Sequence, residues 1–459
     1  GPSLAMGPGA GANHRGATAA HVAVMILNHV AGNAGRTVHY DAGVTAAASS
    51  YAEMESAVSA MAAGQVGVAI IHGANPAYTM PAASGFRAAF EQVGFKVSFA
   101  SAMDETAAMA DLILPDRHFL EAWGDSMPRA GVMAIQQPVM QAVPHFDSKQ
   151  SGDVLLAVAT QLGSDLGSAT FYEYLRARHM AMHDTGDFEA TWQAALHAGA
   201  VEHDMPMGGM SEMRAPDAAL SFDPPVFDAG GDLVLVVHPS PRFGAGEFSN
   251  SPWMQELPDP VSKITWHSWL EMNPHTAEQR GIREGDIVTV SSSHGAVDVP
   301  IWLYPGIRED SVALAMGGGH TDMGRWATGQ GVNVMDLLPS ESEQLSGGLV
   351  TLATTVSVSP TGERRRIATI AGSDDQHDRP IAPAVALAEL GHAAEAEHEE
   401  DGHEEFKELQ GAGGFVPVPS GGGAATAFPL EGTQHGPYAD AHEGPRWGMA
   451  IDLDKCTGC

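Results

Sequence analysis

The last four residues, Cys456-Thr-Gly-Cys459, contain both cysteines of this 459-residue chain. A Cys-x-x-Cys pair can form a redox disulfide, half of a zinc site or the first half of an iron-sulfur motif. A thioredoxin-type pair requires a following helix and a zinc ribbon requires a second cysteine pair, and the sequence has neither. Residues 449–453 alternate like a strand, and an Asp-Lys turn then leads into the cysteines. This order favours the opening of a ferredoxin motif, in which closely spaced cysteines bind a 4Fe-4S cluster.

Cys456 and Cys459 supply two thiolates, whereas a cubane cluster needs four. We therefore expect the other ligands to lie beyond Cys459, and we expect the chain as given to bind no complete cluster. The chain also starts at Gly1, without a basic segment, an apolar core and a cleavage site. The sequence is interpreted as a fragment cut at both ends.

The formal net charge of the chain is −33, from 56 acidic and 23 basic residues. This charge argues against nucleic acid as a partner, because a polyanion is repelled and no basic stripe offsets the repulsion. No window reaches the roughly 18 uninterrupted apolar residues that a membrane-spanning helix needs. Any contact with a membrane is therefore expected to come through a partner.

Helical and strand patterns alternate over residues 1–160, which predicts βαβ units, a parallel sheet and an α/β dinucleotide-binding-like domain. The pattern predicts a helix over 19–30, a strand over 66–71, a helix over 85–94, a strand over 95–101, and a short helix followed by a strand over 104–115. Residues 161–225 have mostly helical periodicity and are interpreted as a helical insertion.

Short strands separated by Gly, Pro, Asn and Asp turns fill residues 226–372, which predicts a β-rich barrel domain. The expected strands lie within 232–241, 263–269, 285–307, 310–319 and 348–372. Residues 373–445 are acidic or rich in Gly and Pro and are interpreted as a linker. Residues 446–459 begin the ferredoxin-like domain.

Two glycine-containing loops and one histidine cluster could bind ligands. Residues 73–76, Gly-Ala-Asn-Pro, follow an apolar strand, where a parallel sheet places ligands, although a simple turn explains them better. Residues 317–324 could cradle an anion but lack the lysine of a P-loop. His392, His398 and His403 could bind a metal loosely, but a solvated acidic linker is the better explanation. No catalytic constellation is recognisable.

Several stretches together resemble the molybdopterin oxidoreductase superfamily. Residues 110–143 resemble its segment that turns back towards the cofactor cleft, and Gly73–Tyr78 resembles its dinucleotide-cradling loop. Residues 256–292, with a Gly-Asp-x-Val turn at 285–288, resemble its dinucleotide-binding double-psi barrel. The resemblance implies that Asn75 and the loop glycines Gly317, Gly318 and Gly319 occupy pterin-facing positions.

A molybdopterin-like domain followed in one chain by a ferredoxin opening resembles the iron-sulfur subunit of alternative complex III. That resemblance implies 4Fe-4S clusters in the intact protein, with Cys456 and Cys459 as the first two ligands, and no molybdenum cofactor. It also implies a quinol-oxidising membrane subunit and cytochrome c-type subunits as partners, on the periplasmic side of the bacterial inner membrane. The expected function is electron transfer and scaffolding.

Two other functions remain open. The first is a catalytic molybdopterin oxidoreductase, such as a polysulfide or thiosulfate reductase, with the pterin phosphates bound by backbone N–H groups and helix N-termini. The residue that faces molybdenum would decide between this function and the scaffold, and it would lie before Gly1. The second is a metal-handling protein that uses the histidines of the acidic linker.

Overall fold

The computed structural model describes residues 2–7, 9, 13–39, 49–129, 131–182, 187–202, 226–228 and 230–370. The chain divides into one unit of residues 1–370 and a second of residues 371–459, and every described residue belongs to the first. The predicted linker, its histidines and the Cys456–Cys459 motif lie outside the described residues.

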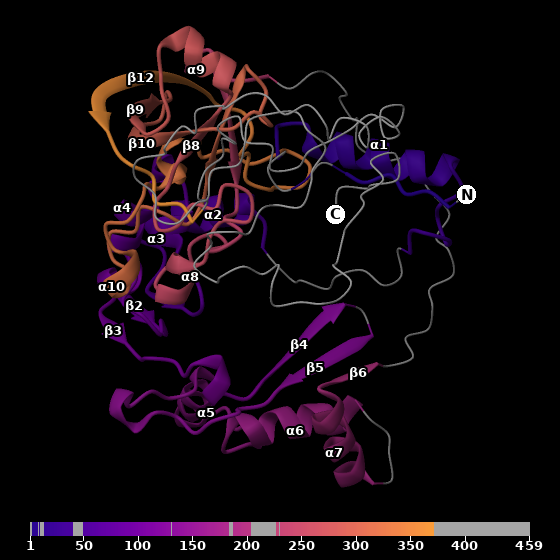
Figure 1. Ribbon diagram of the computed structural model, residues 1–459. Coiled ribbons are helices and arrows are strands. Elements are labelled where there is room, and N and C mark those ends of the chain that lie inside the picture. The colour runs from indigo at the N-terminus through magenta and orange to yellow at the C-terminus, as the bar shows by residue number, and fades with distance from the viewer. Residues whose placement is uncertain are drawn as a thin grey trace, which may run out of the picture. The chain divides into compact units, whose positions relative to one another are not determined.

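A small parallel sheet forms the first part of the described unit (Figure 1). Its order is β1 (Val68–Ile71), β2 (Phe95–Ser98), β3 (Leu112–Ile113), with Val68 opposite Phe95. Helices α2 (Tyr51–Ala62) and α4 (Phe86–Glu91) share a hydrophobic core with residues of β1. The predicted strand–helix alternation and the parallel sheet are therefore present.

Local sequence explains where these helices begin. Ser50 accepts a hydrogen bond from the backbone of Glu53, whose carboxylate accepts one from the backbone of Ser50, so a capping box starts α2. Pro76 occupies the first turn of α3 (Pro76–Thr79), where a missing N–H costs no helical hydrogen bond. Helix α1 (Ala17–Val30) covers the segment predicted as helical at 19–30.

An antiparallel sheet and three helices follow. The sheet consists of β4 (Gly124–Arg129), β5 (Val132–Gln136) and β6 (Ala200–Glu202), in that order. The helices are α5 (Ser151–Gln161), α6 (Phe171–Met182) and α7 (Phe188–Ala198). Trp192 on α7 is buried against Ile135 on β5, which joins the helices to the sheet. The sequence predicted helix for part of this segment but did not predict the β4–β5 hairpin.

A closed six-stranded barrel forms the largest core of the described residues. Its strands run in the order β10-β8-β11-β7-β12-β9, with parallel β10/β8 and β11/β7 pairs and otherwise antiparallel pairs. The strands are β7 (Leu233–His238), β8 (Leu270–Met272), β9 (Asp286–Ser291), β10 (Ala296–Leu303), β11 (Ser311–Ala315) and β12 (Thr355–Arg364). Three short helices accompany them: α8 (Pro252–Glu256), α9 (Pro274–Arg280) and α10 (Gly324–Ala327).

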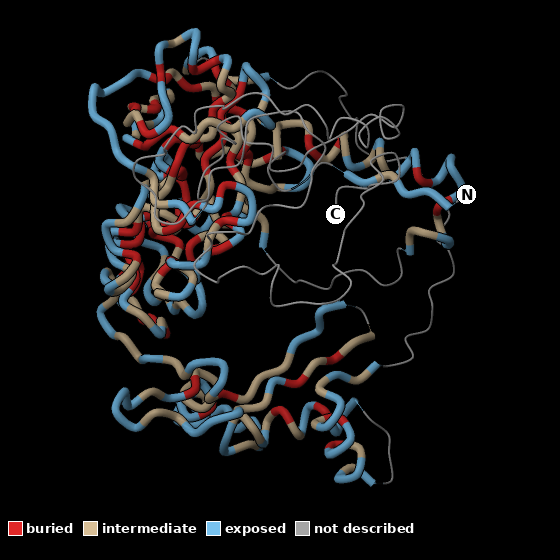
Figure 2. Tube along the Cα trace, in the orientation of Figure 1, coloured by how far each residue is buried: buried red, intermediate tan, exposed pale blue. Residues whose placement is uncertain are grey.

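Alternating side chains fill the barrel. On β7, the inward residues Leu233, Leu235 and Val237 are buried while those between them are partly exposed. Figure 2 shows many of the buried residues in the barrel and its neighbouring loops. Each fully buried Val, Leu or Ile side chain stabilises the fold by about 1.5–3 kcal/mol before entropy is counted. The packed barrel core therefore holds the ends of the loops at its rim in fixed positions.

Short 3-10 helices complete the described elements. They are η2 (Ala82–Ser84), η3 (Ala107–Met109), η4 (Phe119–Glu121), η5 (Pro144–Phe146) and η6 (Val334–Leu337). The short helix expected within 104–115 is the single turn η3, whose start is fixed by Asp104 accepting a hydrogen bond from the backbone of Ala107. No helix in the described ranges is long and apolar enough to span a membrane.

The strand predicted over 263–269 is wrong. Lys263 and Trp266 have φ values of 60° and 67°, and left-handed backbone of this kind interrupts an extended chain. The Asp259 carboxylate instead accepts hydrogen bonds from the backbone of Val261 and Ser262 and stabilises a turn. The regular strand begins only at Leu270.

Candidate functional site

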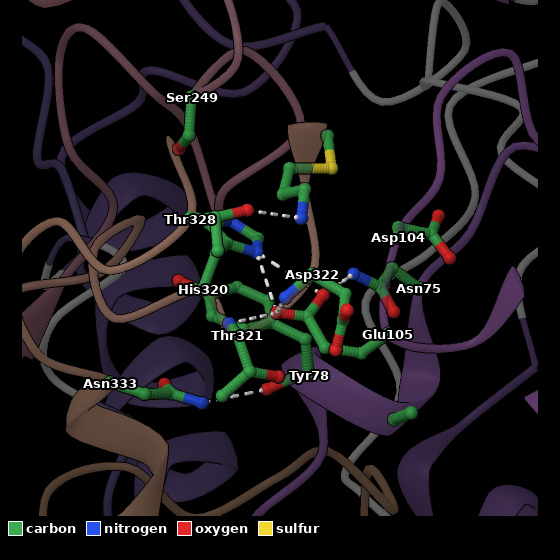
Figure 3. A network of polar contacts seen from close by, with 12 residues as sticks. Asn75, Tyr78, Asp104, Glu105, Ser249, His320, Thr321, Asp322, Thr328 and Asn333 are labelled. Atoms are coloured by element: carbon green, nitrogen blue, oxygen red, sulfur yellow. Dashed lines mark hydrogen bonds and ion pairs between the residues drawn. The ribbon is translucent and has the colours of Figure 1, made fainter. Parts of the chain in front are cut away.

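Glu105 lies at the centre of a buried polar network between the loop that follows β2 and the loop that follows β11 (Figure 3). Its side chain is 1% exposed. One carboxylate oxygen, Oε2, accepts a hydrogen bond from Asn75 Nδ2 at 2.6 Å, and Oε1 accepts one from the Thr321 backbone at 2.8 Å. His320 Nδ1 lies 3.1 and 3.2 Å from the two oxygens.

The surroundings of Glu105 stabilise its ionised form. Burial alone raises the pKa of this carboxyl, but the hydrogen bonds from His320 and Asn75 outweigh burial and lower the pKa to about 2. A carboxylate can only accept hydrogen bonds, so we assign the Nδ1 hydrogen of His320 to the bond with Glu105. The other ring nitrogen, Nε2, is buried and has no hydrogen-bond partner in the described residues.

Tyr78 stacks on the ring of His320, with ring centroids 3.7 Å apart and an interplanar angle of 17°. Its hydroxyl donates a hydrogen bond to the Gly318 carbonyl at 2.8 Å, and Asn333 Nδ2 donates one to the Tyr78 carbonyl at 3.1 Å. Burial, followed by the charge of Glu105, raises the pKa of the Tyr78 phenol. Tyr78 is therefore a neutral hydrogen-bond donor that joins α3 to the glycine loop.

Asn75 lies at the start of α3, at the end of the loop that follows β1. Its Oδ1 accepts hydrogen bonds from the Thr106 backbone at 3.1 Å and the Thr106 hydroxyl at 2.7 Å, while its Nδ2 donates to Glu105. The amide is thus occupied by protein on both its donor and its acceptor side. That Asn75 contacts a pterin stays a prediction.

The loop at Gly317–Gly319 follows β11 and packs tightly against protein atoms. A Cβ on Gly317 would lie 2.7 Å from Phe243 Cβ, and one on Gly319 would overlap the backbone of Asn333. Gly317 and Gly319 also have φ values of 99° and 79°, which only glycine adopts easily. The close packing accounts for these glycines without a ligand, and a pterin contact stays a prediction for them too.

A small pocket lies beside this loop, lined among others by Gly317, Gly318, Arg242, Trp266 and Trp269. Its volume of about 20 Å³ is enough for about one water molecule. A pterin ring does not fit this space. This pocket is therefore no cradle for a pterin dinucleotide in this conformation, and we derive no chemical step through that cofactor.

Sequence reasoning missed Glu105 as a site residue. Tyr78 and His320 lie within the two loops that it named, 73–78 and 317–324, but neither side chain was singled out. An acidic residue just beyond a strand of a parallel sheet is a usable signal for Glu105. No local pattern links Glu105 to His320, because 215 positions separate them. In the described part of the chain, no group of three or more His, Cys, Asp or Glu side chains could hold a metal ion. Cys456 and Cys459 lie outside that part.

Two families match separate parts of this chain. Residues 4–161 match the family described as "Molybdopterin oxidoreductase", and residues 253–349 match "Molydopterin dinucleotide binding domain". The two matches coincide with the α/β part and with most of the barrel part. The Glu105–His320 contact therefore connects the two matched regions.

Three curated relatives share sequence with the chain. It is 32% identical over 296 residues to "Menaquinone reductase, molybdopterin-binding-like subunit" of Nitratidesulfovibrio vulgaris, which covers 61% of this chain and 39% of that protein. It is 32% identical over 111 residues to "Arsenate respiratory reductase molybdopterin-containing subunit ArrA" of Chrysiogenes arsenatis, covering 22% and 13%. It is 22% identical over 322 residues to "Thiosulfate reductase molybdopterin-containing subunit PhsA" of Salmonella typhimurium, covering 60% and 41%.

Among solved structures, acetylene hydratase from Pelobacter acetylenicus is similar, with a TM-score of 0.46 and 13% identity over 66% of this chain and 46% of that one. The chain spans less than half the length of each of these relatives.

Proposed function

Since the chain carries a molybdopterin oxidoreductase domain and a molydopterin dinucleotide-binding domain, we propose that it is an electron-transfer and scaffold subunit of a respiratory quinol-oxidising complex. In this proposal the molybdopterin-type fold supports neighbouring subunits and holds no molybdenum cofactor. The finer assignment within the same proposal is the iron-sulfur subunit of alternative complex III.

One observation supports the scaffold role most directly. The amide of Asn75 and the backbone around Gly318 make their hydrogen bonds to Glu105, Thr106 and Tyr78, all within the protein. A cofactor-binding site normally presents a few convergent polar groups to its ligand. Hydrogen bonds from the Asn75 amide to protein groups are expected if side chains fill the space that a cofactor occupies in other members of the fold.

The relative named "Menaquinone reductase, molybdopterin-binding-like subunit" adds a second argument. It is a subunit of a quinone-linked enzyme, which favours a quinone-linked complex for this chain as well. We propose as partners a quinol-oxidising membrane subunit and cytochrome c-type subunits. The proposed location is the periplasmic side of the bacterial inner membrane, with attachment through those partners.

The proposed electron carriers are 4Fe-4S clusters of the intact protein. Cys456 and Cys459 would supply two thiolate ligands of the first cluster. Such a cluster supplies one-electron transfer, while the protein sets the distance to the next carrier and tunes the potential through hydrogen bonds to sulfur. No chemistry on a substrate is assigned to the described residues.

A catalytic molybdopterin reductase is the second candidate function. The 22% identity to the thiosulfate reductase molybdopterin-containing subunit extends over 60% of this chain and favours it. The fold alone does not decide, because one fold supports both functions.

The deciding experiment analyses the full-length protein purified from its native membrane. Iron and molybdenum are counted by elemental analysis, and pterin is detected by its fluorescence after oxidation. The scaffold proposal predicts several iron atoms per chain and neither molybdenum nor pterin. Molybdenum and pterin at one equivalent would overturn it and make this chain part of a catalytic reductase.

A further inference from the structure

Trp253 is the only tryptophan in the described ranges whose surface is mostly exposed, at 80%. It lies in the first turn of α8, and Leu257 at the end of the same helix is 48% exposed. Phe248, three residues before the N-cap Ser251, is 55% exposed. Single exposed apolar residues are common, but a group of them around an exposed indole is typical of a binding surface.

The segment that carries these side chains is held by hydrogen bonds on its inner side. Gln255 of α8 is 2% exposed, and its Nε2 donates to the Ser249 carbonyl at 2.7 Å. The backbone of Trp326 donates to Asn250 Oδ1 at 3.1 Å. The exposed side chains therefore project from a fixed backbone, which reduces the conformational entropy that is lost when a partner binds.

Carboxylates lie around this apolar group. Glu247 and Glu256 are exposed at the two ends of the segment. Asp322 is exposed two residues before Gly324, and an added Cβ on Gly324 would meet the side chain of Asn250 in the same segment. Apolar side chains at the centre with charged groups around them are the usual arrangement of a protein–protein interface.

The charge of this surface is negative. No lysine or arginine lies between Glu247 and Leu257 in the sequence. Arg325 is exposed beside the segment, with its guanidinium 4.6 Å from the ring centroid of Trp326. The residues that we call the Trp253 face are Phe248, Trp253 and Leu257 together with Glu247, Glu256 and Asp322.

Charge decides which occupant fits the Trp253 face. A second copy of this chain would bring the same carboxylates, and like charges placed opposite each other in an interface repel. Nucleic acid and anionic lipid headgroups are repelled for the same reason. The acidic run at residues 395–405 of the sequence also carries negative charge. A protein with a basic surface around an apolar centre is complementary in both respects.

We propose that the Trp253 face is the docking site for a neighbouring protein subunit whose contact surface carries lysine or arginine around an apolar pocket. Trp253 fills that pocket, and the three carboxylates pair with the cations around it. The inference rests on the proposed function, which assigns neighbouring subunits to the same complex. The net charge of −33 attracts a basic partner before contact is made.

The first test introduces a photoreactive benzoylphenylalanine at position 253 of the full-length protein in its native complex. After illumination, mass spectrometry identifies the cross-linked peptide. The expected result is a cross-link to another protein subunit, in a segment with more Lys and Arg than Asp and Glu. A cross-link to this chain itself, to lipid or to a segment without that excess, or the absence of any cross-link, overturns the proposal.

Two variants then separate the apolar and the charged contributions. Trp253→Ala and Glu256→Lys are each expected to reduce the amount of the cross-linked subunit that the immobilised protein retains at least about tenfold. The matched controls are Leu162→Ala, at a position that is 79% exposed after α5, and Glu278→Lys, at an exposed position of α9 away from α8 (Figure 1). Circular dichroism checks that each variant is folded. Retention by a folded test variant equal to that of its control overturns the proposal.

Failure of this inference and failure of the proposed function are distinguishable. The cross-link reports on the Trp253 face, whereas iron, molybdenum and pterin analysis reports on the cofactors. A cross-link to a basic subunit in a protein that contains molybdenum and pterin supports the docking site and overturns the scaffold role. A cross-link confined to this chain in a protein with iron and no molybdenum overturns the docking site alone.

Discussion

The ring of Tyr78 lies flat against the ring of His320, with centroids 3.7 Å apart. Tyr78 comes from the helix after the first strand of the parallel sheet, and His320 from the loop after the fifth strand of the barrel. The contact therefore joins the two regions that match separate families. Glu105 holds the His320 ring in place through Nδ1, and Gly246 closes over both rings.

Glu105→Gln is expected to destabilise the described unit by about 1–3 kcal/mol. The amide keeps the shape but replaces one acceptor oxygen by a donor, which faces either Asn75 Nδ2 or the backbone N–H of Thr321. Urea unfolding followed by circular dichroism measures the loss. Glu363→Gln on the exposed part of β12 is the matched control and should be neutral. A Glu105→Gln midpoint equal to that of the control would contradict a structural role for the charge.

Acid should remove the contribution of Glu105 in a defined pH window. The pKa of this carboxyl is lowered from an ordinary value of 4.5 to about 2 in the folded chain. A lowered folded pKa means that the stabilisation is fully present above pH 4.5 and is lost as the pH falls towards 2. The difference of about 2.5 units corresponds to about 3 kcal/mol.

The pH experiment compares unfolding free energies of wild type and Glu105→Gln between pH 2 and 7. Asp104 opposes the trend, since burial raises its pKa and its contribution therefore has the opposite sign. Asp104 is present in both proteins, but the charge of Glu105 contributes to its raised pKa, so the difference between the curves reports Glu105 together with its coupling to Asp104. If the two stability curves stay parallel through the acid range, the pKa of Glu105 is not lowered in the folded chain.

The sequence predicted elements well where the pattern is local. Alternating residues and turn glycines located β9 and β10, and helical spacing located α1, because each signal lies within one element. The prediction of a strand over 263–269 was wrong because its apolar residues, Ile264 and Trp266, lie in a turn that contains left-handed backbone. Apolar composition alone does not separate an extended segment from a buried turn.

The candidate site was less predictable for a different reason. Asn75 and Gly317–Gly319 were singled out from the sequence, and both lie in the network or against it. Their partners Glu105 and His320 meet only because the sheet loop and the barrel loop come together in three dimensions. A contact that depends on tertiary packing leaves no periodic signal in one sequence.

Gly246→Ala is expected to lower the free energy of unfolding by more than an ordinary substitution of glycine does. Gly246 has a φ of 125°, and an added Cβ would lie 2.6 Å from Tyr78 Cε1 and 2.8 Å from His320 Nε2. Strain and overlap together should destabilise the chain by about 2–4 kcal/mol. Gly281→Ala is the control, because its φ is 65° but no atom lies within 4 Å of an added Cβ.

The measurement for the glycine pair is the midpoint of thermal unfolding. Gly281→Ala isolates the cost of left-handed backbone, about 1–2 kcal/mol. The surplus loss in Gly246→Ala then reports the closeness of packing over the Tyr78–His320 stack together with the greater backbone strain at a φ of 125°. If both variants lose the same stability, Gly246 does not close the junction.

Cys456→Ser in the full-length protein is expected to lower the iron content by about one 4Fe-4S cluster. Serine oxygen is a poorer ligand for iron-sulfur clusters than thiolate, so the cluster with this ligand should be lost or become labile. Iron analysis and low-temperature electron paramagnetic resonance of the reduced protein measure the change. The matched control is Thr457→Ser, which alters the same loop without touching a thiol. Full iron content in Cys456→Ser would mean that the motif binds no cluster, and the electron-transfer half of the proposed function would then have to be abandoned while the fold assignment remained.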